Sequence, residues 1–229
     1  MTNLDKVKWH VVKDGVQLAR EASDKILHDA RLAIAERDKF NIVLAGGSTP
    51  IRTYQYMARL DAEWPRWQVY FGDERCLPRD DMDRNSFQIV NKFLNDVAVP
   101  KTQIHYILAE SGFEIAVSDY ERKIRQVMPF DLVLLGMGED GHTASLFPGQ
   151  EHDEKLEVVG VPDSPKPPSD RVSLNYPSLC NTRKMLILIE GEHKRPAVQA
   201  WLDGEDLPIS RVSGFESTDV YIDESAYPR

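Results

Sequence analysis

Short runs of apolar residues alternate along this chain with longer segments in which apolar residues recur every three or four positions. A short apolar run is typical of a buried strand, and the three-or-four spacing is typical of one face of a helix. The apolar runs predict strands at residues 7–12, 41–45, 67–71, 132–135, 155–161, 171–175, 185–189 and 220–222. The spaced pattern predicts helices at residues 16–37, 50–60, 86–96, 113–127 and 192–202.

Strands that alternate with helices of this length are typical of an α/β protein with a parallel sheet. The pattern therefore predicts one domain over residues 1–229, with a doubly wound, mainly parallel, Rossmann-like sheet flanked by helices. A proline-rich loop at 165–168 separates two of the later strands, and we find no interdomain linker or internal repeat. In such sheets, ligands bind at the carboxyl ends of the strands, so we expect functional side chains at those positions.

Composition narrows the classes of partner. With 229 residues, 41% of them apolar and 28% charged, the chain is long enough to bury a substantial core. A net charge of −9 argues against a nucleic-acid partner but leaves room for a local cationic pocket. The first residues resemble no signal peptide, and no apolar run approaches a membrane span.

Cysteine usage and the lack of metal-ligand spacing predict the setting. Two cysteines, Cys76 and Cys180, make no disulfide framework, which favours a reducing cytoplasm. We expect no metal, no cofactor and no membrane partner, and either a monomer or a weak homo-oligomer. Cys76 is interpreted as a small buried filler.

The first candidate site follows the strand at 41–45, where the chain reads Gly46-Gly47-Ser48-Thr49-Pro50. Thr49 suits an N-cap and Pro50 suits a first helical turn. Free backbone N–H groups and two hydroxyls at a helix N-terminus could hold a phosphate. A tight turn without a ligand explains the same local pattern equally well.

The second candidate is Gly72-Asp73-Glu74-Arg75, after the strand at 67–71. An acid and an arginine at a strand end could activate or position a substrate. A surface ion pair is the simpler interpretation of these residues.

The third candidate is the segment 131–149, in which the apolar run at 132–135 leads into a loop with Gly136, Gly138 and Gly141. This loop also carries Asp140 and His142. An imidazole titrates near neutral pH, so His142 could act as a base that Asp140 orients. The three glycines match the spacing of a dinucleotide-binding loop, but Pro148 leaves no room for the long helix that this motif needs.

Four cations lie near the starts of later strands or helices: Lys166, Arg171, Lys194 and Arg195. Each alone is more typical of a solvated surface. Together they could neutralise a phosphate dianion, which arginine can bind through two parallel hydrogen bonds.

Several long motifs now identify a resemblance. The segments NIVLAGGSTP (41–50), VYFGDERCLP (69–78), DLVLLGMGEDGHTASLFPG (131–149), VPDSPKPPSDRVSL (161–174) and MLILIEGEHKRPAVQ (185–199) resemble the 6-phosphogluconolactonase family. They cover most of the chain in the expected order. The resemblance implies hydrolysis of 6-phospho-D-glucono-1,5-lactone to 6-phosphogluconate in the oxidative pentose phosphate pathway.

The resemblance also implies roles for individual residues. His142, oriented by Asp140, would activate water, and Arg75 would stabilise the oxyanion. Asp73 would either orient Arg75 or bind a sugar hydroxyl. The 6-phosphate would be held by Gly46, Gly47, Ser48, Thr49, Lys166, Arg171 and Lys194.

Two departures from related patterns matter. Many relatives have Ser-Asn where this chain has Arg84-Asn85, which leaves Asn85 as a substrate contact and Arg84 without a role. Glucosamine-6-phosphate deaminase/isomerase is similar in fold, but it carries a glutamate where this chain has Phe147. Phenylalanine cannot move protons, so the resemblance favours the lactonase.

Two alternatives remain open: an amino-sugar phosphate isomerase, and a non-catalytic sugar-phosphate sensor. A sensor would keep the phosphate site without needing His142, and it usually carries a DNA-binding segment, which we do not see. No nucleophilic serine is expected, because Ser145 lacks the motif of a nucleophile elbow.

Overall fold

The computed structural model describes residues 4–228, and these form one α/β domain around a seven-stranded sheet. Neighbouring strands in this sheet all pair in parallel. In spatial order they are β1 (Val7–Val12), β10 (Ser217–Asp223), β9 (Thr182–Ile189), β6 (Phe130–Gly136), β2 (Phe40–Leu44), β3 (Trp67–Phe71) and β5 (Ile104–His105).

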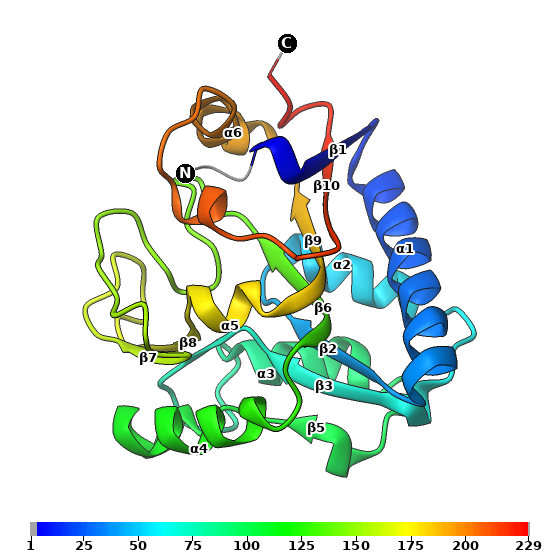
Figure 1. The fold of residues 1–229 in the computed structure, drawn as a ribbon, viewed down its shortest axis with the longest axis vertical. Helices are drawn as coiled ribbons and strands as arrows, with labels where there is room; N and C mark the ends of the chain where they lie inside the picture. The colour runs from blue at the N-terminus through cyan, green and yellow to red at the C-terminus, as the bar shows by residue number, and fades with distance from the viewer. Residues whose placement is uncertain (1–3, 229) are drawn as a thin grey trace.

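Helices cover the sheet as the sequence predicted. Figure 1 shows α1 and α2 on the right of the sheet and α5 on the left. The helices are α1 (Gly15–Arg37), α2 (Ser48–Met57), α3 (Asn85–Ile89), α4 (Phe113–Arg125), α5 (Tyr176–Cys180) and α6 (Arg195–Leu202). The mainly parallel, helix-flanked fold is therefore confirmed, and residues 1–3 and 229 of the predicted domain lie outside the described part.

The core of the sheet is formed by its central strands. Every residue of β2 is buried, and so is every residue of β6 up to Gly136. A parallel strand with helices on both faces buries both sets of its alternating side chains, which explains the continuous apolar runs in the sequence. These rigid strands support the loops that follow them.

Helix α1 shows how local chemistry sets an element's ends. The Asp14 side chain accepts hydrogen bonds from the N–H groups of Val16 and Gln17, which caps the first turn. The helix ends at Asp38, whose left-handed backbone (φ 62°) lets its N–H donate to the carbonyl of Ile34.

Three strands make a separate antiparallel sheet, which corrects the expectation that the strands predicted at 155–161 and 171–175 join the single, mainly parallel sheet. Strand β4 (Asp73–Arg75) pairs with β8 (Arg171–Leu174), which pairs with β7 (Val158–Val161). The segment after β3 was expected to be a loop. It is instead tied to β8 by the bond from the N–H of Leu174 to the carbonyl of Gly72 and by the β4–β8 ladder.

Several element boundaries also differ from the prediction. Helix α2 starts at Ser48 with Gly47 as its N-cap, so Thr49 lies inside the first turn. The helix expected at 86–96 is a short α-helix followed by a π-helical turn, Val90–Leu94. Strand β5 and helix α5 were not predicted, because they have two and five residues and carry no periodic signal.

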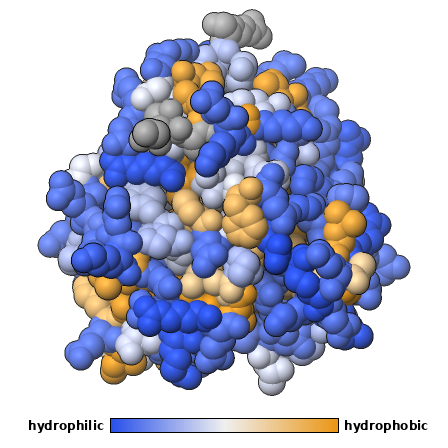
Figure 2. Space-filling model, viewed as in Figure 1, coloured by the Kyte–Doolittle hydropathy of each residue, from blue (hydrophilic) through white to orange (hydrophobic). Residues whose placement is uncertain are grey.

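The surface contains no extended apolar area on the face shown in Figure 2, where hydrophobic residues appear as small separate groups. Within residues 4–228, no helix is both long and apolar enough to cross a bilayer. Both cysteines are free thiols of intermediate burial, so Cys76 is only partly the buried filler that was expected.

Candidate active site

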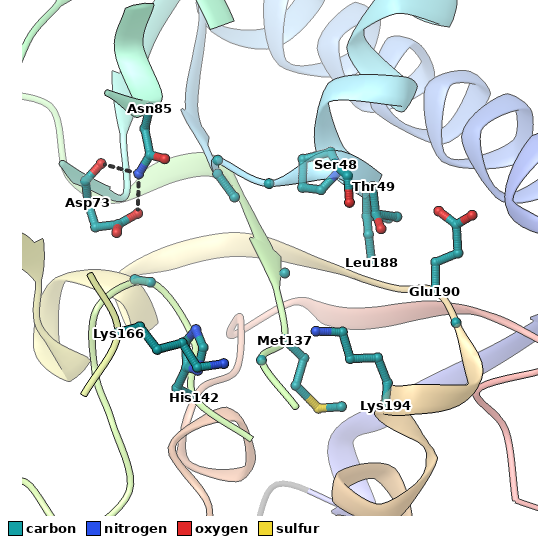
Figure 3. A pocket seen from close by; sticks show the side chains of 18 of the residues that line it. Ser48, Thr49, Asp73, Asn85, Met137, His142, Lys166, Leu188, Glu190 and Lys194 are labelled. Carbon is teal, nitrogen blue, oxygen red and sulfur yellow. Dashed lines mark hydrogen bonds between the residues drawn. The ribbon is translucent and has the colours of Figure 1, made fainter. Parts of the chain in front are cut away.

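The loops that follow the central strands surround a cavity of about 380 Å³ at the carboxyl edge of the sheet. Its lining includes all of the predicted site residues except Asp140 and the candidate cation Arg195. Figure 3 shows Ser48 and Thr49 at the start of α2, the pair Asp73–Asn85, and the side chains of His142, Lys166 and Lys194 facing the same space. The lining residues with functional side chains are Ser48, Thr49, Arg52, Asp73, Arg75, Asn85, His142, Lys166, Arg171, Glu190, His193 and Lys194.

His142 and Asp140 form the pair that the sequence predicted. The Nδ1 atom of His142 contacts the Oδ1 atom of Asp140, and the loop is closed by the bond from the N–H of Gly138 to the carbonyl of His142 (2.8 Å). A Cβ on Gly138 would lie 2.0 Å from Nδ1 of His142, so only glycine leaves space for the imidazole here. With Nδ1 occupied by the carboxylate, Nε2 is the nitrogen left for a ligand.

The surroundings of this pair set its protonation. Burial lowers the pKa of His142, and the nearby Lys166 ammonium adds to this, while the Asp140 carboxylate opposes it. Burial raises the pKa of Asp140, but its contacts with His142 and the charge of Lys166 outweigh this, so the net pKa is below the ordinary value. At neutral pH the pair is therefore a neutral imidazole held by an ionised carboxylate, which is the state a general base requires.

Asp73 is fixed by two neutral partners. Its Oδ1 atom accepts a hydrogen bond from Nδ2 of Asn85 (3.0 Å), and its Oδ2 atom accepts one from the Ser145 hydroxyl (2.6 Å). Ser145 is fully buried, so it serves as a donor to Asp73. Glu74, next along the chain, is also buried, which excludes the simple surface ion pair for this segment.

The start of α2 provides backbone donors to the cavity, as predicted. Residues Gly46, Gly47, Ser48 and Thr49 all line it, and α2 has no side-chain cap on its first turn. The N–H groups there and the positive end of the helix dipole favour an anion.

Three of the four predicted cations line the cavity, and the fourth, Arg195, does not. Lys166 and Lys194 line the cavity, and burial together with the charge of Lys166 lowers the pKa of Lys194. Arg171 also lines it, but its guanidinium donates to the carbonyls of Lys166, Pro167 and Pro168 and to Ser145. Arg171 thus anchors the proline-rich loop that carries Lys166. Arg195 donates to the carbonyl of Ser225, outside the cavity lining.

Arg75 lines the cavity. Its Nη1 atom donates to the carbonyl of Asp83, and its Nε atom is buried with no hydrogen-bond partner within residues 4–228, so Nε is not a donor that a ligand can reach. No ion pair joins Arg75 to Asp73 among these residues, so the geometry gives no support to Asp73 as the group that orients Arg75.

Sequence reasoning missed Arg52, Glu190 and His193, which line the far side of the cavity. Arg52 and Glu190 form an ion pair there. Glu190 directly follows the buried strand β9, so the strand-end rule that located Asp73 could have located it too. Arg52 carried no such signal, because it lies within α2 and reaches the cavity only through the packing of that helix.

Metal binding has no support from side-chain clustering. Across residues 4–228 there is no group of three or more His, Cys, Asp or Glu side chains arranged to hold an ion. The chain also runs from Gly136 to Val158 without a helix, so the glycine loop after β6 lacks the helix of a dinucleotide-binding motif.

A parallel α/β sheet with a cavity at its strand ends, lined by several cations and by a histidine on a glycine loop, defines a Rossmann-like α/β protein. Residues 13–221 match the family model described as glucosamine-6-phosphate isomerases/6-phosphogluconolactonase, and the chain belongs to this family.

Curated relatives agree with this assignment. The 6-phosphogluconolactonase of Mycobacterium tuberculosis is 32% identical over 235 residues, which cover 94% of this chain and 95% of the relative. A rice protein named "Probable 6-phosphogluconolactonase 4, chloroplastic" is 36% identical over 190 residues. That match covers 74% of this chain and 58% of the rice protein's length.

Solved structures show the same fold. The crystal structure of 6-phosphogluconolactonase from Thermotoga maritima superposes with a TM-score of 0.90 at 31% identity, covering 96% of this chain and 100% of the other. A monomeric glucosamine-6-phosphate deaminase of the NagB superfamily reaches a TM-score of 0.82 at 23% identity, which is a likeness of fold alone.

Proposed function

We propose that this protein hydrolyses 6-phospho-D-glucono-1,5-lactone to 6-phosphogluconate. Family membership, the full-length similarity to relatives named 6-phosphogluconolactonase, and a cationic cavity with a neutral histidine support this proposal. This reaction is the hydrolysis of a carboxylic ester. The proposed site would supply a base, a group that stabilises the oxyanion and a segment that binds the phosphate.

The observation that carries the proposal is the environment of Phe147. Its ring is buried and lies 4.6 Å, centroid to centroid, from the His142 imidazole. The Arg171 guanidinium lies over the same ring at 5.5 Å. An isomerase would need a carboxylate at this position to pass protons to the histidine, and here the side chain at this position is an apolar ring.

The proposed reaction begins with water bound at Nε2 of His142. The imidazole takes a proton from the water as its oxygen forms a bond to the lactone carbonyl carbon, and the carbonyl oxygen becomes an oxyanion. Arg75, whose side chain lines the cavity, would stabilise this charge. The bond from the carbonyl carbon to the ring oxygen then breaks, and His142 returns the proton to that oxygen, giving the free hydroxy acid.

The phosphate would lie at the start of α2, against the N–H groups of Gly47, Ser48 and Thr49, with Lys194 and Lys166 supplying charge. Asp73, held by Asn85 and Ser145, would accept a hydrogen bond from a sugar hydroxyl. Arg171 would act on the phosphate only indirectly, by holding the loop that carries Lys166.

The expected setting follows from the same reasoning. We propose a cytoplasmic enzyme that acts as a monomer or weak homo-oligomer on a small sugar phosphate, without nucleic acid. Two free thiols and the net charge of −9 support this setting.

The test is a spectrophotometric assay on freshly generated 6-phosphogluconolactone. Purified protein should speed the decay of the lactone above its spontaneous rate, and His142→Ala should lose about 10²–10⁴-fold of this activity while still binding 6-phosphogluconate. Ammonia released from glucosamine 6-phosphate would instead favour the isomerase. Sugar-phosphate binding that His142→Ala leaves intact, in a protein with no turnover, would favour a sensor.

A further inference from the structure

Arg84 is a large buried side chain that the proposed mechanism does not use. It is 1% exposed, and its guanidinium contacts two carboxylates from different segments. Nε lies 3.3 Å from Oε2 of Glu74, and Nη1 donates to Oε2 of Glu110 (2.7 Å). Further bonds reach the carbonyls of Ile107 (3.0 Å) and Leu77 (3.3 Å). Burying an arginine this deeply is costly unless its charge is matched, and two carboxylates match it here. Nη1 and Nη2 are hydrogen-bonded, whereas Nε faces Glu74 as an ion pair without hydrogen-bond geometry.

Glu74 links this arginine to the start of α3. The carboxylate is 1% exposed, and its Oε1 atom accepts from the backbone N–H groups of Arg75 and Asn85, both at 2.8 Å. Its Oε2 atom accepts from the N–H of Ser86 at 2.9 Å. The carboxylate therefore joins strand β4 to the first turn of α3, and the Arg84 guanidinium lies beside it as the opposite charge.

Asn85 carries this geometry into the cavity. Its Nδ2 atom donates to both the carbonyl and the carboxylate of Asp73, at 3.1 and 3.0 Å. A Cβ on Gly46 would lie only 2.1 Å from the Oδ1 atom of Asn85, so this amide packs directly against the glycine. One amide thus contacts the carboxylate expected to bind the sugar and the loop expected to bind the phosphate, and Figure 3 shows it directed at Asp73.

We infer that Arg84 is a positioning residue, which acts through Glu74 and Asn85 to hold Asp73 in place against the substrate. The inference rests on the proposed function for its effect on turnover, while the linkage itself rests on geometry alone. The Arg84 side chain thereby ties together strand β4, the loop before α3 and the segment that follows β5.

The test is a double-mutant cycle on lactone hydrolysis with Arg84→Lys and Asn85→Ala. Lysine keeps the charge but loses the planar fork. Arg84→Lys should lower kcat at least about tenfold, because small displacements of a positioned group are costly. Its effect on the affinity for inorganic phosphate should stay within about twofold, since the start of α2 is intact.

The readout that separates positioning from plain stability is the double variant. If Arg84 acts through Asn85, adding Arg84→Lys to Asn85→Ala should cause no further loss of kcat, while Tm falls equally in both backgrounds. Losses of kcat that multiply in the double variant, or an unchanged kcat in Arg84→Lys, would overturn the inference. Arg37→Lys is the control, because Arg37 pairs with the buried Asp131 near the amino end of β6, away from the cavity at the carboxyl ends of the strands.

Hydrogen exchange of the Asn85 and Ser86 amides tests the linkage without activity. Arg84→Lys should speed exchange at both amides, and Arg37→Lys should not. If the wild-type protein proves inactive on the lactone yet exchange responds in this way, the proposed function fails and the positioning role stands. Unchanged exchange in Arg84→Lys would remove the positioning role whatever the activity.

Discussion

The chemistry of single residues centres on the contrast between the two neighbours of His142. Asp140 holds one nitrogen by hydrogen bonding, and Phe147 covers the ring with apolar surface. The carboxylate raises the pKa of the imidazole and burial lowers it, with burial dominant. The result is an imidazole whose pKa lies below its ordinary value, so it is unprotonated at neutral pH, as the proposed base needs to be.

The first prediction concerns the pH dependence of turnover. Because the pKa of His142 lies below 6.5, kcat/KM should stay constant from pH 8 to 6.5 and fall only as the pH drops through that lower pKa. Asp140→Asn removes the group that raises this pKa, so the acidic limb should move to still lower pH, with a plateau reduced by about tenfold or more. Initial rates measured from pH 8 down to well below pH 6.5 give both the position of the acidic limb and the height of the plateau. An acidic limb above pH 6.5, or one that Asp140→Asn moves upward, would contradict the assignment.

At this scale the sequence was informative where a residue acts with close neighbours in the chain. Asp140 and His142 are two positions apart on a glycine loop, and the structure brings them together. Arg84 could not be interpreted, because its partners Glu74 and Glu110 come from other loops and only folding reveals that they share a buried space.

Among the elements, the turn from β2 into α2 has the tightest steric requirement. Gly46 is followed by Gly47 with φ 103°, a conformation that side chains rarely adopt. Behind Gly46 lies the amide of Asn85. This turn therefore depends on a neighbouring loop as well as on its own sequence.

The second prediction is that Gly46→Ala impairs the site more than the fold. The new methyl group would overlap Oδ1 of Asn85, and moving that amide frees Asp73. We expect kcat/KM to drop by about 10²-fold. Gly204→Ala is the contrasting variant. Gly204 has a positive φ of 87°, but nothing lies within 4 Å of its added Cβ. This variant should lower Tm by backbone strain and leave kcat unchanged, and the reverse pattern would refute this account of the turn.

The third prediction concerns strand β6. Leu134 is fully buried at its centre, so Leu134→Ala should lower the free energy of unfolding by about 2–5 kcal/mol. On edge strand β1, Val11 is 46% exposed, and Val11→Ala should change it by less than about 0.5 kcal/mol. Urea unfolding followed by circular dichroism measures both. Similar losses for the two variants would mean that β6 is not the centre of the core.

Elements with strong periodic patterns were predicted well, and those that depend on pairing were not. The apolar runs of β2, β3, β6 and β9 each identify a strand, because a strand buried on both faces has few polar residues. The small antiparallel sheet was misassigned, since its strands have three or four residues and apolar content does not reveal which neighbour they pair with.

On the scale of the whole molecule, the charge is distributed unevenly. The chain carries a net charge of −9, yet the cavity lining holds Arg52, Arg75, Lys166, Arg171 and Lys194 against Asp73 and Glu190. A cavity with low-dielectric walls concentrates the field of its cations. An anionic substrate is therefore attracted to the cavity and repelled by much of the remaining surface.

The fourth prediction follows from this distribution. Raising the salt concentration from about 0.01 to 1 M shortens the screening length from about 30 to 3 Å, so kcat/KM for the phosphorylated lactone should fall several-fold. Most of that change should appear in KM. Unphosphorylated glucono-1,5-lactone serves as the control, and its kcat/KM should respond little. Equal salt dependence for the two lactones would show that the phosphate is not what the cations attract.

The order of strands in the large sheet has a consequence for synthesis. Strand β1 pairs only with β10, which places Val7 beside Thr218, and β10 is the last strand of the described chain. A nascent chain leaving the ribosome therefore carries β1 without its partner until nearly all of the domain has emerged. The edge of β9 that receives β10 stays open for the same period, so two unpaired strand edges are exposed until residues 217–223 have emerged.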